Sequence, residues 1–361
     1  MEQRRDKISN IQIVFLVSSA TMGVGGLSLP RIATETAYAD GGFATFITGI
    51  IALVLLFFTA KLAIKFSNDT IIEYSNKIVG NFLGKIIGLA FIIYFIVVCA
   101  VILRAFASTL KLLLLPKTPL EFILITMLLT STYLTSNGIS SIAKICELFA
   151  PAIIAVILLL IFLPIQNFKI EEFYPAFSRG AMPIIKAIPK IFPSFFGYEI
   201  ILFITPFVFD KEKLLSRSMI GISIPIVIFT LLVFAATGIF GMQAISYSLY
   251  PTLEMAKYIN FPGAFAERFD IFFMIFWTMG SFITLSCYYY MATLSITRWL
   301  GLINYKPFAI IIIPFIFILS IIPSDIQSTS NLASITGLAG TILTASSILL
   351  LIIATLKERY R

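Results

Sequence analysis

Two apolar stretches of the chain contain helix-breaking residues, and such breaks free backbone groups that can bind a ligand. The first stretch runs from Ser19 to Pro30 and holds Gly23, Gly25 and Gly26. Glycine costs about 1 kcal/mol and proline about 3 kcal/mol in a helix, so helix propensity falls by about 6 kcal/mol here. In hydrocarbon, non-helical backbone is tolerated only where it is buried in protein or lines a cavity. The break therefore predicts a site.

The second break lies in Ile191–Phe207, where Gly197 interrupts an apolar helix and Pro206 follows. This stretch also holds Glu199, a carboxylate where a spanning helix normally has none. Interrupted helices at corresponding places in two halves point to a transporter binding site. Glycine and proline are also common in membrane helices for packing alone. The pairing of the two breaks favours the site over packing.

The chemistry expected at such breaks suits a ligand with two opposite charges. Backbone amides at the positive end of a half-helix hold a carboxylate, and free carbonyls hold an ammonium group. An α-amino acid supplies both charges. The predicted ligand-binding residues belong to the two breaks and to one later span, with ordinary core packing as the alternative for each: Thr21, Met22, Gly23, Val24, Gly25, Gly26, Phe195, Phe196, Gly197, Tyr198, Glu199, Ser281 and Thr284.

Arg104 and Glu199 are predicted to be intramembrane charges. Each costs about 2.5–3.5 kcal/mol at the centre of a spanning helix. Such residues usually face the protein interior and find partners. Glu199 therefore has two open interpretations. In the functional one it accepts a proton or the ammonium group of a ligand. In the structural one it accepts hydrogen bonds from free backbone amides, or it pairs with Arg104.

Composition places the chain among polytopic membrane proteins. Of its 361 residues 59% are hydrophobic and 12% are charged, with a mean hydropathy of +1.01. We expect a single membrane domain over residues 1–361 and no soluble domain. The absence of histidine excludes histidine-based metal sites and general bases. We predict no cofactor, no metal and no nucleic-acid partner. Because the sequence shows no nucleophile constellation, we also predict that the protein is not an enzyme.

The apolar runs predict an all-α protein with ten transmembrane helices. More than half of the 26 lysines and arginines then fall on the side of the N-terminus, which places both termini in the cytoplasm. The spans form a 5+5 inverted repeat with discontinuous helices 1 and 6, and the repeats are residues 8–163 and 187–356. The predicted spans are Ile8–Ile32, Gly42–Phe66, Gly80–Leu115, Pro119–Thr135, Ile139–Leu163, Ala187–Phe209, Leu214–Gly241, about 270–300, Phe308–Ile322 and Leu332–Leu356.

Several motifs resemble those of a known family. They are Met22–Gly26 with Pro30, Phe196–Glu199 with Pro206, and Tyr250–Glu254 followed by Glu267–Asp270 and Trp277. The sequence is similar to the spore germination permeases, the B subunits of nutrient germinant receptors, within the amino acid–polyamine–organocation superfamily. The resemblance implies a protein of the spore inner membrane that senses a small nutrient, often an amino acid, together with A and C subunits.

The function expected from the residues and the resemblance together is a germinant-receptor subunit in the lipid bilayer of the spore inner membrane or the cell membrane. An amino-acid-like ligand would bind at the two breaks and favour one conformation, which the A and C subunits would read. Two alternatives remain open. One is a proton-coupled amino-acid transporter of the same fold, and the other is an ion-conducting pore.

Overall fold

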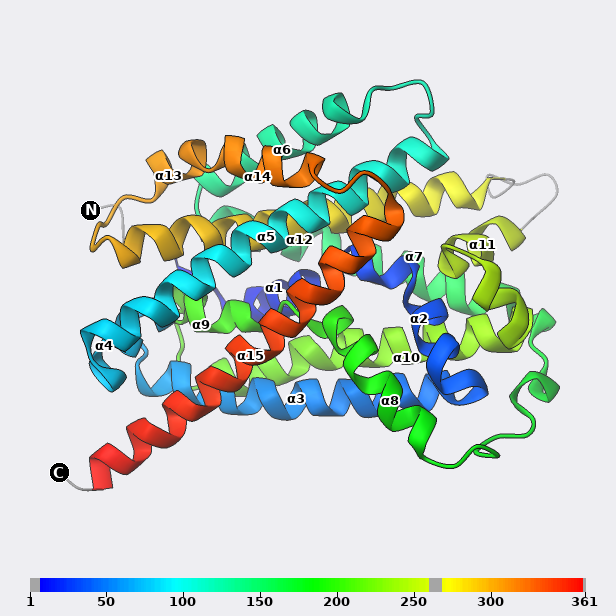
Figure 1. Cartoon of the computed structure of the whole chain (residues 1–361), viewed down its shortest axis with the longest axis horizontal. Helices are drawn as coiled ribbons and strands as arrows, with labels where there is room; N and C mark the ends of the chain where they lie inside the picture. Colours follow the sequence, from blue (N-terminus) through cyan, green and yellow to red (C-terminus); the bar gives the residue numbers. More distant parts are fainter. Residues whose placement is uncertain (1–6, 260–267, 360–361) are drawn as a thin grey trace.

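The protein, seen here as a computed structural model, is described for residues 7–259 and 268–359, and these form a bundle of helices (Figure 1). The main helices run roughly along the long axis of the bundle. The α-helices are α1 (Asn10–Thr21), α2 (Leu29–Ala37), α3 (Gly41–Lys65), α4 (Ile71–Val79), α5 (Asn81–Leu113), α6 (Leu120–Ser136), α7 (Ile139–Phe162), α8 (Met182–Ile191), α9 (Ile201–Ile204), α10 (Leu214–Tyr247), α11 (Pro251–Tyr258), α12 (Phe269–Trp299), α13 (Lys306–Ile311), α14 (Ile313–Ile321) and α15 (Ile326–Arg359).

Six helices in the described part of the chain are long and apolar enough to cross a membrane. The count becomes seven if the pair Met182–Phe195 and Tyr198–Phe207, bent by 50°, is one span. Three shorter apolar helical segments, Asn10–Thr21, Leu120–Ser136 and Lys306–Ile321, lie in other predicted spans. The fold is therefore that of an all-helical, multi-pass membrane protein.

The first predicted break is present and separates two helices. Helix α1 ends at Thr21, a short 3-10 helix η2 covers Val24–Leu27, and α2 begins at Leu29. Pro30 lies in the first turn of α2, where its missing N–H would have no intrahelical partner in any case. The proline therefore starts the second half-helix, and the glycines interrupt the chain before it.

The second break is centred on Gly197, which separates the 3-10 helices η6 (Phe192–Phe195) and η7 (Tyr198–Ile200). Gly197 has φ +124°, a conformation that side chains rarely adopt. A Cβ atom placed there would overlap the backbone of Ala20 and lie 2.6 Å from the backbone nitrogen of Thr21. The two breaks are thus in direct backbone contact, which glycine permits.

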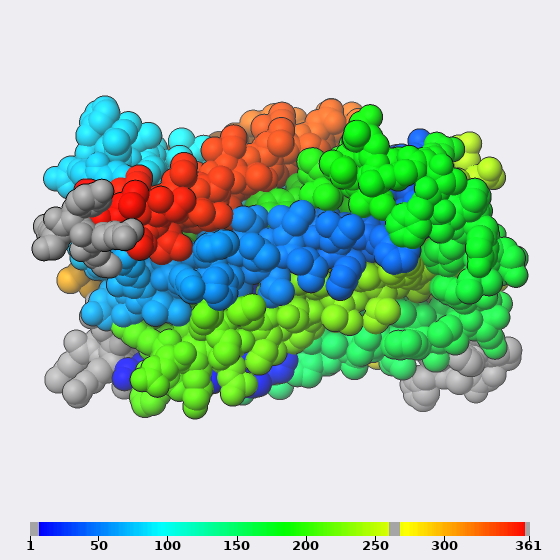
Figure 2. Space-filling model, turned by 90° about the horizontal axis from the view of Figure 1, so that it is seen from below, coloured from blue at the N-terminus to red at the C-terminus, as the bar shows by residue number. Residues whose placement is uncertain are grey.

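The broken helices lie inside a frame of longer ones. Helix α1 packs against α7, α10 and α12, while α5 packs against α12, α14 and α15. Helix α3 lies between α15 and α10 on one face of the bundle, as Figure 2 shows from below, and it also contacts α8. The two halves of the chain are therefore interleaved rather than side by side.

One end of the bundle is closed by main-chain pairing between the two halves. The N–H of Ile8 donates to Phe207 O at 2.9 Å, and the N–H of Phe209 donates to Ile8 O at 3.1 Å. Beside this pairing, Asn10 Nδ2 donates to Asp210 Oδ2 at 3.2 Å. The bond from Asn10, assisted by the positive charge of Lys213, holds the pKa of Asp210 below its ordinary value.

The observed helices differ from the predicted spans at two places. Helix α10 continues to Tyr247 through a non-helical Gly241 with φ +74°, where the sequence predicted an end. The predicted ninth span consists of α13 and α14, because Pro314 has no N–H with which to continue the first helix. Glu267, at the predicted start of the eighth span, lies outside the described residues.

Candidate ligand-binding site

A cavity of about 420 Å³ is lined by residues of both breaks. Its remaining walls come from α5, α12 and α15, and it extends toward the end of the bundle that carries α11. The lining residues nearest the breaks are Thr21, Val24 and Gly25 from the first break, Pro193, Ser194 and Phe196 from the second, Tyr94 and Val98 from α5, Thr284 and Tyr288 from α12, and Thr336 and Gly337 from α15.

The first break supplies hydrogen-bond donors to this cavity. Val24 and Gly25 are the first two residues of η2, so their N–H groups have no acceptor within that helix. Both residues line the cavity. The four-residue helix itself is too short to build a substantial dipole. The amides themselves remain as donors for a carboxylate.

Glu199 does not line the cavity but is held behind it with 3% of its surface exposed. Its Oε2 accepts the N–H of Gly197 at 2.7 Å. Its Oε1 accepts the hydroxyl groups of Tyr288 at 2.9 Å and of Tyr94 at 3.2 Å. The structural interpretation, in which the carboxylate bonds to a free backbone amide, describes this arrangement, and the two tyrosines link the carboxylate to the cavity wall.

Arg104 has other partners among the described residues and does not pair with Glu199. Its Nη2 donates to Ser324 O at 3.1 Å and its Nη1 donates to Ser320 O at 3.5 Å, near the C-terminal end of α14. A cation is favourable at that end of a helix. Tyr94, which contacts Glu199, precedes Arg104 by ten residues, or about 15 Å along α5. This spacing explains why the alternative pairing is not formed.

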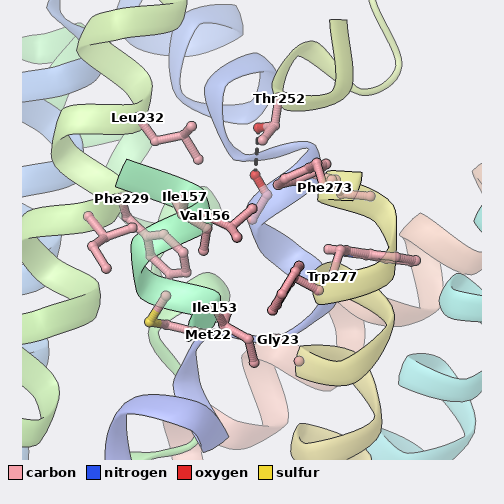
Figure 3. A pocket seen from close by; sticks show the side chains of 15 residues that line it. Met22, Gly23, Ile153, Val156, Ile157, Phe229, Leu232, Thr252, Phe273 and Trp277 are labelled. Atoms are coloured by element: carbon pink, nitrogen blue, oxygen red, sulfur yellow. Dashed lines mark hydrogen bonds between the residues drawn. The ribbon is translucent and has the colours of Figure 1, made fainter. Parts of the chain in front are cut away.

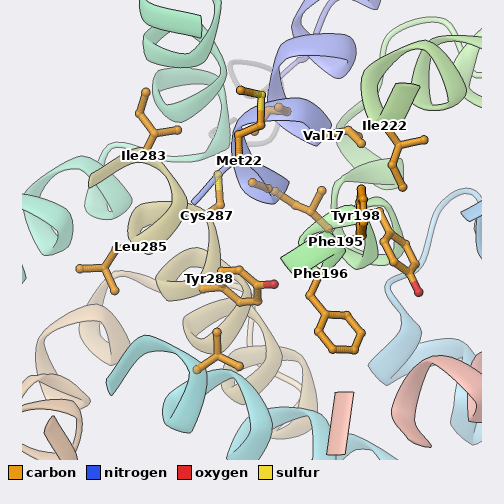
Figure 4. Packing of buried hydrophobic residues seen from close by; sticks show 14 of the residues in the cluster. Val17, Met22, Phe195, Phe196, Tyr198, Ile222, Ile283, Leu285, Cys287 and Tyr288 are labelled. Atoms are coloured by element: carbon orange, nitrogen blue, oxygen red, sulfur yellow. The ribbon is translucent and has the colours of Figure 1, made fainter. Parts of the chain in front are cut away.

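The predicted site residues separate into three groups. Thr21, Gly23, Val24, Gly25, Phe196 and Thr284 line the large cavity. Met22, Gly23 and Gly26 line a second cavity of about 40 Å³, which is mainly apolar and includes Phe229 and Trp277 (Figure 3). Phe195, Gly197, Tyr198, Glu199 and Ser281 line neither cavity, and Figure 4 shows Phe195 and Tyr198 among the packed core side chains.

Sequence reasoning missed two tyrosines and the role of the tenth predicted span. Tyr94 is one polar residue in an apolar run, and Tyr288 belongs to a run of three tyrosines that points in several directions. Helix α15 is rich in small residues, which favour close packing against neighbouring helices. It does pack closely, since a Cβ at Gly337 would lie 2.5 Å from Pro193 Cγ, but Gly337 also lines the cavity. The small residues of α15 that face the second break are therefore the sequence feature that could have predicted its place in the cavity wall.

The mouth of the cavity carries charged residues that the sequence did not single out. Arg31 Nε donates to Glu35 Oε1 at 2.6 Å. The side chain of Arg31 is 33% exposed and that of Glu35 is 41% exposed. Lys190 donates to Thr36 Oγ1 at 2.9 Å. Because Arg31, Glu35 and Lys190 all line the cavity, its entrance has a net positive charge.

Comparison with known proteins identifies the family. The family model of spore germination proteins matches residues 7–329. The chain belongs to this family. Spore germination protein YndE of Bacillus subtilis is 27% identical over 98% of both chains, and spore germination protein A2 of the same organism is 26% identical over 98% of this chain and 97% of that protein. GerLB of Bacillus cereus is 25% identical over 90% of this chain and 88% of that protein.

Solved transporter structures share the fold of this spore germination protein. MhsT in complex with L-phenylalanine has a TM-score of 0.72 at 13% identity, with 94% of this chain and 88% of that chain covered. A Na⁺-coupled sialic acid symporter has a TM-score of 0.70 at 12% identity, with 93% and 78% covered. The chain is thus a permease-like membrane protein of the germination family with a transporter fold.

Substitution of Gly197 should damage folding, whereas substitution of Gly25 should not. A Cβ at Gly25 would lie 3.6 Å from Ser194 Oγ, an ordinary contact, while one at Gly197 would overlap the Ala20 backbone. We expect Gly197→Ala to lower stability by more than about 1–3 kcal/mol, the usual cost of overpacking, and Gly25→Ala to leave it nearly unchanged. Thermal unfolding in detergent measures both, and equal melting temperatures would contradict the direct contact of the breaks.

Arg104 and Glu199 should act independently on stability. Each has its own partners, so Arg104→Met and Glu199→Gln should both lower the free energy of unfolding. The double variant should show the sum of the two losses to within about 0.5 kcal/mol. A double-mutant cycle on purified protein measures this sum. A double loss far smaller than the sum would show that the charges interact after all.

Proposed function

We propose that this chain is the B-type membrane subunit of a spore germinant receptor and that it binds an amino acid in the cavity between its two breaks. The observation that carries the proposal is this cavity of about 420 Å³, with backbone donors from the first break and hydroxyl groups from α5 and α12. That volume lies in the range of small-molecule sites, about 300–1,000 Å³. The family and the fold support the same assignment.

In the proposed binding mode, the carboxylate of the ligand accepts hydrogen bonds from the N–H groups of Val24 and Gly25. Its ammonium group lies toward Tyr94 and Tyr288, and its side chain lies against Val98 and Phe196. The lining near Phe196 is mainly apolar, which suits an amino acid with a small or apolar side chain. The positive charge at the mouth attracts the carboxylate of an approaching ligand.

In the proposed topology, the chain crosses the spore inner membrane ten times as two inverted five-helix repeats, residues 8–163 and 187–356. Helices 1 and 6 are discontinuous, and both termini are cytoplasmic. Helices α8 and α9 then belong to one broken span, and α13 and α14 to another. Ligand binding favours one conformation of the bundle, and the A and C subunits of the receptor respond to that change. The shift is limited by the difference in affinity for the two conformations.

Closing the space at the first break should weaken binding without unfolding the protein. Gly25→Val places two methyl groups between the breaks, where the proposed carboxylate lies, so we expect the Kd for amino acids to rise at least about tenfold. Binding of radiolabelled L-alanine, L-valine and L-phenylalanine to purified protein measures this change. Exposed Ile47→Val is the control and should bind normally. Normal binding by folded Gly25→Val would place the site elsewhere.

A proton-coupled amino-acid transporter is the second candidate, favoured by the transporter fold of MhsT and the sialic acid symporter. Sensing and transport differ in net movement of the ligand. We expect vesicles that contain the purified chain to bind an amino acid but not to accumulate it when a proton gradient is imposed. Accumulation that depends on the gradient, and that Gly25→Val removes, would establish transport instead.

A further inference from the structure

Four hydroxyl groups line the inner end of the cavity, and each has already donated its proton to the protein. Thr21 Oγ1 donates to Val17 O at 2.9 Å, and Thr284 Oγ1 donates to Ser19 O at 2.7 Å. The hydroxyl groups of Tyr94 and Tyr288 are bonded to Glu199 Oε1. A hydroxyl group has one proton and two lone pairs. Each of these four oxygens therefore retains only lone pairs for the cavity.

The direction of the two tyrosine bonds depends on whether Glu199 is ionised. A backbone N–H is always a donor, so the bond from Gly197 fixes Oε2 as an acceptor. Oε1 receives both tyrosines, and an ionised carboxylate oxygen can accept from both at once, whereas a protonated one would donate to one of them. With Glu199 ionised, both tyrosines and the N–H of Gly197 donate to its carboxylate.

We propose that Glu199 is a positioning residue that makes this end of the cavity a pure hydrogen-bond acceptor, and so restricts the ligand there to a protonated amine. The inference rests on the proposed ligand-binding function and specifies its chemistry. An ammonium group has three donors and no lone pair, which matches an all-acceptor surface. A ligand with a hydroxyl group in place of the ammonium group also carries lone pairs, and these would face the lone pairs of the protein. It also lacks the positive charge that strengthens hydrogen bonds to the cavity wall.

Glu199→Gln is the informative variant because the N–H of Gly197 fixes the orientation of the amide. The amide oxygen must replace Oε2 to accept that N–H, so the amide nitrogen replaces Oε1 and faces both tyrosines. The hydroxyl groups of Tyr94 and Tyr288 then accept hydrogen bonds, and their protons turn toward the cavity. The variant keeps the shape of the site and reverses the hydrogen-bonding character of its wall.

The first measurement compares each L-amino acid with its 2-hydroxy acid, using alanine with lactate, valine with 2-hydroxyisovalerate, and phenylalanine with phenyllactate. The full-length wild type should prefer the amine, and Glu199→Gln should lose at least about tenfold of that preference, since bonds to charged groups are the stronger kind. Glu147→Gln is the matched control. Its carboxylate accepts from Gln12 Nε2 at 2.9 Å and lines neither cavity, so the preference should be unchanged.

The second measurement needs no ligand. The C–O stretching band of tyrosine in the infrared distinguishes a hydroxyl group that donates from one that accepts. Difference spectra between the wild type and Tyr94→Phe or Tyr288→Phe isolate each band. Both should be donors in the wild type and acceptors in Glu199→Gln, while Glu147→Gln should match the wild type.

The outcomes separate the inference from the proposed function. Wild-type protein that binds no amino acid overturns the proposed function. The infrared bands then still test whether Tyr94 and Tyr288 donate to Glu199. A folded Glu199→Gln variant with the amine preference of the wild type overturns the inference alone. If Glu199→Gln does not fold, the wild-type bands and the Tyr288→Phe variant decide. Accepting tyrosines in the wild type, or an unchanged amine preference in Tyr288→Phe, would overturn it.

Discussion

The contact between Gly197 and the backbone of Ala20 and Thr21 is the constraint on which the site depends. It brings two segments that are about half the chain apart into van der Waals contact without any side chain between them. Helix termini in both segments then lie around one space, and the cavity forms beside the contact. Any residue larger than glycine would separate the segments, so the position of the site is fixed by the smallest residue available.

The buried carboxylate of Glu199 shows how the bundle accommodates a charge. Desolvating an ion costs several kcal/mol even in real proteins. Here three hydrogen-bond donors, from Gly197 at the second break and from α5 and α12, offset that cost. The two bonds from Tyr94 and Tyr288 join the second break to two of the long frame helices. Glu199 is therefore both a charge that needs partners and the connection that orients the cavity wall.

The sequence predicted the helical class, both breaks and six of the residues that line the cavity. The breaks could be predicted because glycine clusters lower helix propensity locally, and this effect can be calculated without knowing the fold. It did not predict Tyr94, Tyr288 or the partners of Arg104, because these depend on which helices meet. Tyr94 and Glu199 are 105 residues apart, and Arg104 and Ser320 are 216 apart. Side-chain periodicity does not specify such distant contacts.

The main-chain pairing of Ile8 with the residues around Val208 has a consequence for how this protein can change over evolutionary time. The two bonds use only N–H and C=O groups, which every residue other than proline supplies in the same form. Paired substitutions at these positions are therefore not needed to keep the bonds, and covariation between them would be weak. Closure at this end can persist while the sequences of the two segments drift apart.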